Sequence, residues 1–146
     1  MAIVVYKGAR VDLLAGAVVT GADVRVLAVM DGSTAPTDED AVNLDDFGTL
    51  YEFDGAGYTR LDLANVVVAH DDANDRTEVT ADAGSFGTTV SPGSDPIIGF
   101  VYYRRVDGTA ANDVAWVYND SGELPADPGG ADFDLTPSPD GFLQIG

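Results

Sequence analysis

The chain has 146 residues, of which 45% are hydrophobic, so it can bury one core of ordinary size. Its 25 acidic residues outnumber 7 basic ones and give a net charge of −18, which argues against binding nucleic acid or an anionic membrane surface. The sequence contains no Cys, which excludes disulfide and thiolate chemistry. No apolar stretch reaches the length of a signal-peptide core or a membrane span, so we expect a soluble protein made in a host cytoplasm.

The first part of the chain predicts two strands on either side of an ambiguous segment. Residues 3–6 are apolar and fit a short strand. Residues 11–19 fit either a short helix or a strand, and Gly16 weakens both interpretations. Residues 23–30 alternate clearly between two faces, which predicts a strand that is buried on at least one face.

The middle of the chain predicts four further strands and one hairpin. Residues 49–53 and 58–63 fit strands that are separated by a turn with two glycines. Residues 65–70 and 76–81 flank a polar Asp-Asp-Ala-Asn-Asp turn. This pair is the best hairpin candidate in the chain, because an alternating strand follows the turn directly.

The last part of the chain predicts a central strand and several shorter ones. Residues 97–106 are the most apolar segment and predict a central strand with a bulge at Gly99, on which residues 114–118 pair back. Shorter strands are expected at 86–90, 132–136 and 141–145.

Short strands at regular spacing, without a convincing long helix, indicate an all-β fold. We expect a β-sandwich or jelly-roll-like domain of eight to nine strands that spans residues 1–146, with 131–146 as a loosely attached C-terminal segment. The apolar positions of the predicted strands give the expected core residues Val24, Val26, Val66, Val68, Ile98, Phe100 and Val117.

One polar turn carries the residues that could bind a cation. Asp71, Asp72, Asn74 and Asp75 supply oxygens of the kind that Ca²⁺ prefers, so a structural cation is one interpretation. Asp and Asn are also the usual turn residues, and the EF-hand pattern is missing. His70, the single imidazole, precedes this turn, and we interpret it as a solvated residue at a strand end.

Aromatic residues gather in the last predicted central strands. These residues are Phe100, Tyr102, Tyr103, Trp116 and Tyr118. We favour the interpretation that they form a sandwich core. The other interpretation is a platform for contact with carbohydrate or with another subunit. Arg104 and Arg105 hold two of only seven positive charges. We therefore expect Arg104, Arg105, Tyr103 and Trp116 as interface positions, because a cation on so acidic a chain finds many carboxylate partners.

The order of segments over residues 22–146 resembles that of structural proteins of tailed bacteriophages and archaeal viruses. The segments that carry the resemblance are ADVRVLAVM, NLDDFGTLYEF, DGAGYTRLDLANVVVAHDDANDRTEVTADAGSFGTTV, DPIIGFVYYRRV and ADFDLTPSPDGFLQIG. The loop NDSGELPADPGG departs from the pattern.

The resemblance implies a capsid decoration or cement protein on the virion surface, bound to the major capsid protein and commonly trimeric. No catalytic residue and no cofactor come with it. The alternative is a head-fibre or tail adhesin module that binds host-surface glycans, which an exposed Trp116 or Tyr103 would favour. A hydrolase is the third interpretation, and the single His without a nucleophile motif argues against it.

Overall fold

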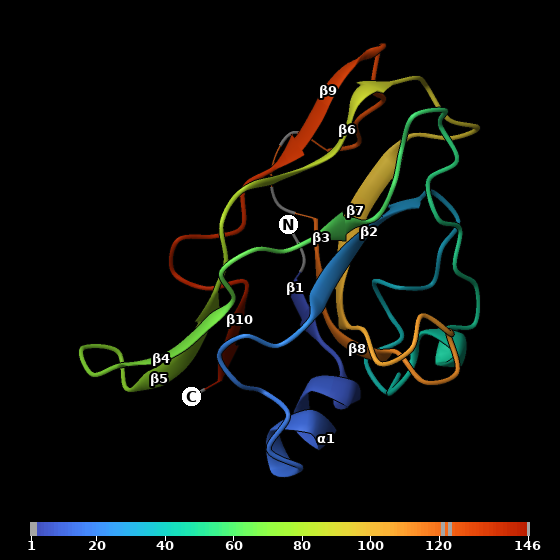
Figure 1. Ribbon diagram of the computed structural model, residues 1–146. Coiled ribbons are helices and arrows are strands. Elements are labelled where there is room, and N and C mark those ends of the chain that lie inside the picture. Colours follow the sequence, from blue (N-terminus) through green and yellow to red (C-terminus); the bar gives the residue numbers. More distant parts are fainter. Residues whose placement is uncertain (1–2, 121, 123, 146) are drawn as a thin grey trace.

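The computed structural model describes residues 3–120, 122 and 124–145. Within these residues it contains ten strands, and all paired strands run antiparallel. The predicted all-β class is therefore confirmed, and the strands form two layers as in a sandwich (Figure 1).

The first layer is a five-stranded sheet. Its strands, in spatial order, are β1 (Ile3–Val5), β8 (Val114–Asn119), β7 (Ile97–Arg104), β2 (Val24–Met30) and β3 (Leu61–Asp62). The predicted central strand is thus the middle strand of this sheet. Its register against β2 shifts between Ile97 and Gly99, next to the predicted bulge. A Cβ at Gly99 would lie 2.4 Å from the ring of Tyr118, so this close approach requires glycine.

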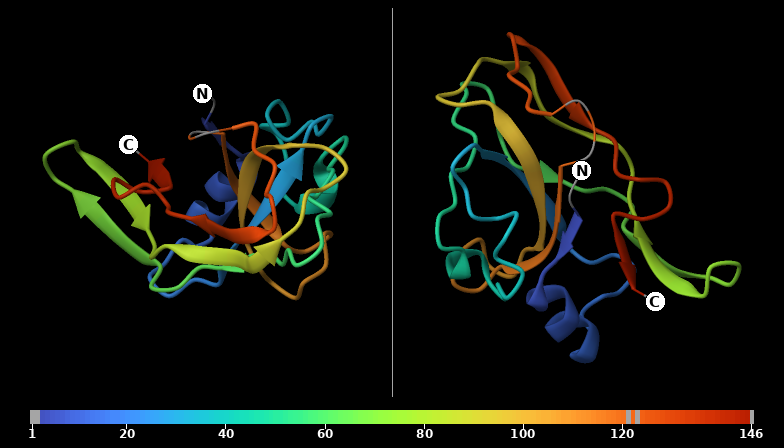
Figure 2. Two further views of the ribbon diagram at one scale, coloured as in Figure 1. Left: turned by 90° about the horizontal axis from the view of Figure 1, so that it is seen from above. Right: turned by 180° about the vertical axis from the view of Figure 1, so that it is seen from behind.

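The second layer contains one three-stranded and one two-stranded sheet. The former consists of β10 (Leu143–Ile145), β5 (Arg76–Thr80) and β4 (Val67–Asp71), and the latter of β6 (Gly84–Val90) and β9 (Ala131–Leu135). The predicted hairpin is confirmed as β4 and β5, which project beyond the rest of the molecule (Figure 2).

The five-stranded sheet is buried on both faces. On β2, Val24 and Val26 face the second layer, while Leu27 and Val29 face a second apolar cluster. Residues 31–50 cover that second face and contribute Phe47 and other apolar side chains to the cluster. This segment includes one 3-10 turn, η1 (Leu44–Asp46). A strand covered on both faces reads as a nearly continuous apolar run, which explains the composition of β2, β7 and β8.

Most of the predicted core is confirmed. The buried members are Val24, Val26, Val66, Phe100 and Val117. Val68 and Ile98 are only half-buried and pack against the edges of the two clusters. Val68 lies on the outer strand of its sheet, and Ile98 lies at the register shift of β7.

The C-terminal segment is not loosely attached, which corrects the expectation for residues 131–146. Over the described residues 131–145, β9 pairs with β6 and β10 pairs with β5. Phe142 and Leu143 are buried in the core, and the ring of Phe142 stacks on Tyr102 at 4.8 Å. The strands predicted at 132–136 and 141–145 form as β9 and β10, and the apolar side chains of this segment complete the inner face of the second layer.

The helix α1 (Lys7–Leu14) begins before the ambiguous segment 11–19 and includes its first four residues. Its small residues Gly8 and Ala9 lie against the first layer, and a Cβ at Gly8 would lie 2.2 Å from the Ala115 carbonyl oxygen. The helix ends in a Schellman motif, in which Gly16 has a φ of +76° and the Ala17 N–H donates to the Asp12 carbonyl. Gly16 therefore ends a helix, where the sequence alone left its role open.

Two predicted strands next to β2 are shorter or absent. Residues 49–53 form only an isolated bridge between Glu52 and Val29, and residues 58–63 contain only the two residues of β3. The Tyr58 hydroxyl accepts a hydrogen bond from the Ala28 N–H at 3.0 Å. The Ala28 N–H is thus satisfied by a side chain, while the Met30 N–H and the Ala28 carbonyl bond to the backbone of Tyr51 and Phe53.

Candidate functional site

The two aromatic residues expected at an interface are buried. Tyr103 is 1% exposed and Trp116 is 0% exposed, so the fold excludes both from direct contact with a partner. The Tyr103 hydroxyl accepts a hydrogen bond from Arg60 Nη1 at 3.0 Å, and the same guanidinium binds both carboxylate oxygens of Glu52. Trp116 lies in the apolar cluster on one face of the sheet and Tyr103 in the cluster on the other, and the local sequence pattern could not reveal that both faces are covered.

Arg104 is also engaged inside the molecule, contrary to its expected interface role. Its Nε and Nη2 donate to Asp12 Oδ2 and Oδ1 at 2.6 and 2.9 Å. Trp116 Nε1 donates to the same Asp12 Oδ2 at 2.8 Å. The hydrogen bond to Asp12 raises the pKa of Arg104. These contacts hold α1 on the end of β7 and β8, so Arg104 positions a helix.

Arg105 remains a candidate for partner contact. Its side chain is half-buried at the end of β7 and forms no ion pair with any described residue. Its positive charge helps to lower the pKa of Asp107, whose largest shift comes from the Thr109 hydroxyl. The neighbouring side chain of Val106 is exposed.

In the polar turn between β4 and β5, hydrogen bonds within the turn engage Asp71 and Asn74, two of the residues that one interpretation assigned to a cation. Asp71 accepts hydrogen bonds from the Ala73 N–H and the Asn74 side chain, and the bond from Asn74 lowers its pKa. Asp72 and Asp75 are almost fully exposed, 3.5 and 3.7 Å from His70 Nε2. Nowhere in the described chain do three or more His, Cys, Asp or Glu side chains converge to hold a metal ion. The four oxygen-bearing residues therefore build a turn, and His70 is half-exposed at the strand end, as expected.

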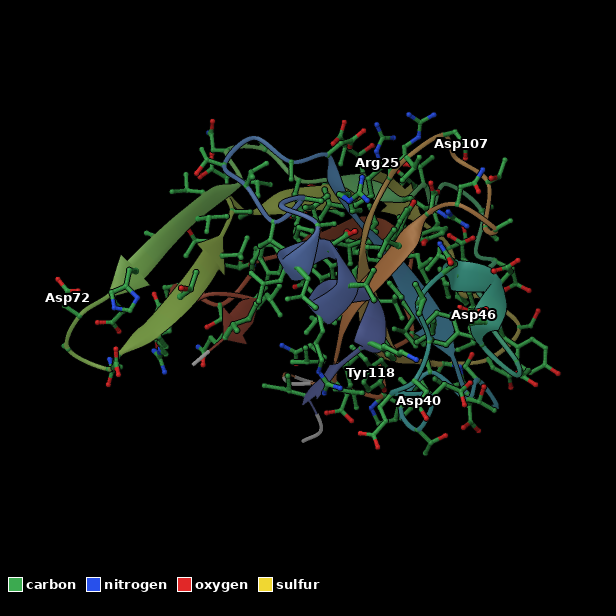
Figure 3. All side chains as sticks on the ribbon, turned by 90° about the horizontal axis from the view of Figure 1, so that it is seen from below. Arg25, Asp40, Asp46, Asp72, Asp107 and Tyr118 are labelled. Carbon is green, nitrogen blue, oxygen red and sulfur yellow. The ribbon has the colours of Figure 1, made fainter. Side chains whose placement is uncertain are left out.

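The β4–β5 hairpin is an arm with a partly open edge. Near its base the Val68 N–H donates to Thr20 Oγ1 at 3.0 Å, and the Val66 carbonyl accepts from the Gly21 N–H. The backbone N–H of Val68 therefore points away from β5. Because backbone groups alternate along a strand, the N–H and C=O of His70 point to the same outer edge. Asp72 marks the tip of this arm, far from α1 and the first layer (Figure 3).

A second exposed feature is one face of α1, which we call the α1 surface: Lys7, Arg10, Val11 and Leu14. Residues at spacings of three, four and seven share one side of a helix. Val11 is 42% exposed and Leu14 is 91% exposed. Neither cation forms an ion pair with a described residue, and Arg10 contacts only the Val5 carbonyl, at 3.4 Å. The sequence pattern alone did not indicate this surface, because its four residues share one side only when residues 7–14 form a helix.

Comparison with known proteins adds no relative. No family model, curated protein or solved structure matches the chain. Among the described residues, no helix is long and apolar enough to cross a membrane.

Proposed function

We propose that the protein decorates the capsid of a tailed virus, where it binds the outer surface of the major capsid lattice and stabilises it. The observation that carries the proposal is the β4–β5 arm, which projects from a body with a well-packed interior. The segment order that resembles virion proteins supports the same role. No catalytic step is needed for it.

The arm suits a contact that bridges neighbouring lattice subunits. It carries the exposed apolar side chain of Val67 and the open backbone edge at His70. An open edge can accept a strand from a partner, in which backbone hydrogen bonds supply the affinity. Each contact of this size is weak, but several contacts by one oligomer reinforce one another.

The buried aromatic residues favour decoration over a glycan-binding adhesin. Binding of sugars by stacking requires exposed aromatic faces, whereas Tyr103 and Trp116 lie in the two apolar clusters. Their rings stiffen the scaffold, which is what a protein that reinforces a shell needs.

The proposal is tested first by stoichiometry. Quantitative mass spectrometry of purified particles should find this chain in numbers comparable with the major capsid protein. A few copies per particle would indicate a fibre or tail part, and absence from particles would refute a virion role.

The arm is tested with a proline that blocks strand addition. The His70→Pro variant removes an outward N–H while the backbone bonds to β5 remain, because only residues 67, 69 and 71 face that strand. We expect His70→Pro to lose capsid occupancy in a co-sedimentation assay, and His70→Ala, which keeps the N–H, to retain it. Equal occupancy of both variants would contradict a strand-like contact of the arm.

A further inference from the structure

We propose that the α1 surface binds an acidic hollow on a second copy of this chain. This contact would join copies of the proposed decoration protein to one another. Its biological purpose rests on the proposed function, but the contact itself can be measured without capsids. It starts from Lys7 and Arg10 of α1, which form no ion pair with the part of the chain that the structure describes and lie beside exposed apolar side chains on a molecule of charge −18.

The hollow lies beside the start of α1. It has a volume of about 400 Å³ and is lined by Thr37, Asp38, Asp40, Ala41 and Asp46. Two of its carboxylates are held by the local backbone, since Asp38 accepts from the Gly48 N–H at 2.8 Å and Asp46 from the Asn43 N–H at 2.8 Å. Asp40 is exposed. The hollow is therefore a built, negatively charged surface.

The backbone holds the α1 surface and the hollow side by side. The Lys7 N–H donates to the Glu39 carbonyl at 2.9 Å, and the Gly8 N–H donates to the Ala41 carbonyl at 3.0 Å. Figure 3 shows Asp40 on the same side of the molecule as α1, and Asp46 farther from α1, on η1. Two adjacent patches of opposite charge are self-complementary, so a rotation axis beside them brings α1 of one copy onto the hollow of the next.

Charge complementarity selects a second copy as the occupant. Four of the other five cations, namely Arg25, Arg60, Arg76 and Arg104, form ion pairs within their own chain. Arg105 also forms no ion pair with a described residue, but it adjoins only one exposed apolar residue, Val106. The α1 surface combines two unpaired cations with Val11 and Leu14, whose burial against the partner supplies the apolar part of the contact.

The test is a charge swap in the full-length chain. One variant carries Lys7→Glu and Arg10→Glu. A second carries Asp40→Lys in the lining of the hollow and Glu39→Lys at the exposed residue between the lining residues Asp38 and Asp40, and a third carries all four changes. Sedimentation equilibrium should show at least ~10-fold weaker self-association for the first two and recovery for the third, because opposite charges face each other again. The second variant lowers the net negative charge, so a general loss of repulsion would strengthen association instead.

A matched control places the same charge change elsewhere. Asp72→Lys with Asp75→Lys at the tip of the arm should leave self-association unchanged, and Leu14→Asp should weaken it. Circular dichroism confirms that each variant is folded. A monomeric wild-type chain at all concentrations, or a four-fold variant that stays as weak as the first two, would overturn the proposal. These measurements do not involve capsids. If the protein failed to bind capsids, the measured self-association would therefore still hold.

Discussion

Asp12 shows how one buried carboxylate organises the N-terminal part of the molecule. It is 3% exposed and accepts hydrogen bonds from two nitrogens of Arg104 and from the indole of Trp116. An ion pair that is well satisfied by hydrogen bonds can be retained in the interior, whereas a single buried charge is costly. The pair therefore specifies where α1 sits on the sheet.

Replacement of Arg104 by Glu should destabilise the fold. The change leaves Asp12 buried without its cation and places a second negative charge beside it, so we expect a loss of about 3–5 kcal/mol in the free energy of unfolding. Urea denaturation measures it. Arg105→Glu is the control and should cost less than about 1 kcal/mol, because Arg105 forms no ion pair in the described chain. Equal stability of the two variants would contradict the role of Asp12.

Gly8 gives a prediction in which local propensity and packing have opposite signs. Helix propensity alone favours Gly8→Ala by about 1 kcal/mol. The new Cβ would lie 2.2 Å from the Ala115 carbonyl oxygen and 2.5 Å from the Val42 carbonyl oxygen, so α1 must move away from the sheet. We expect a lower melting temperature for Gly8→Ala. A higher one would show that α1 adjusts without cost.

At the scale of elements, the connection between β7 and β8 is organised by two carboxylates. Asp113 is fully buried, and its Oδ1 accepts from the backbone N–H groups of Val106 and Gly108 at 2.8 and 3.2 Å. Asp107 accepts from the Thr109 N–H and hydroxyl and from the Asn112 side chain. Hydrogen bonds from Thr109 and Asn112 lower the pKa of Asp107. The connection is thus held by hydrogen bonds to the side chains of Asp107 and Asp113.

The lowered pKa of Asp107 predicts the direction of a pH effect. A carboxylate with a depressed pKa in the folded state adds stability above its unfolded pKa of about 4 and loses it as the pH falls through the folded value. The difference in melting temperature between wild type and Asp107→Asn should therefore be largest above about pH 5 and shrink towards about pH 2. The exposed Asp132→Asn serves as control, and a difference that grows on acidification would refute the assignment.

At the scale of the whole molecule, net charge dominates the long-range electrostatics. The surface ion pairs, such as Arg25 with Asp23 at 3.1 Å, are worth at most about 1 kcal/mol each. They involve few cations, whereas 25 acidic residues repel one another over the whole surface. Screening by salt weakens both effects, and the repulsion is the larger one.

The melting temperature should therefore rise with NaCl concentration. The Debye length falls from ~10 Å at 0.1 M to ~3 Å at 1 M, which removes most of the repulsion between exposed acids. A variant in which Asp72, Asp75 and Asp132 are replaced by Asn should show a smaller rise, because it carries three fewer negative charges. A melting temperature that stays constant or falls in salt would contradict this prediction.

The sequence by itself determined the all-β class, the central strand β7, the β4–β5 hairpin and most of the core. These features depend on the alternation of apolar side chains and on turn residues, which are local properties of the chain. The charge pattern likewise indicated a strongly acidic surface. Among the expected interface residues, Tyr103 and Trp116 are buried and Arg104 pairs with Asp12, whereas Arg105 is neither buried nor ion-paired in the described structure.

Only the tertiary structure decided what is available on the surface. Arg104 finds Asp12 at a distance of 92 positions in the chain, and residues 31–50 cover the face that carries Tyr103. The α1 surface depends on a helix of weak local signal, which is held in place by the close approach of Gly8 to β8. Local pattern specifies which residues alternate, but long-range contacts decide which of them are covered, because burial depends on segments that are remote in sequence.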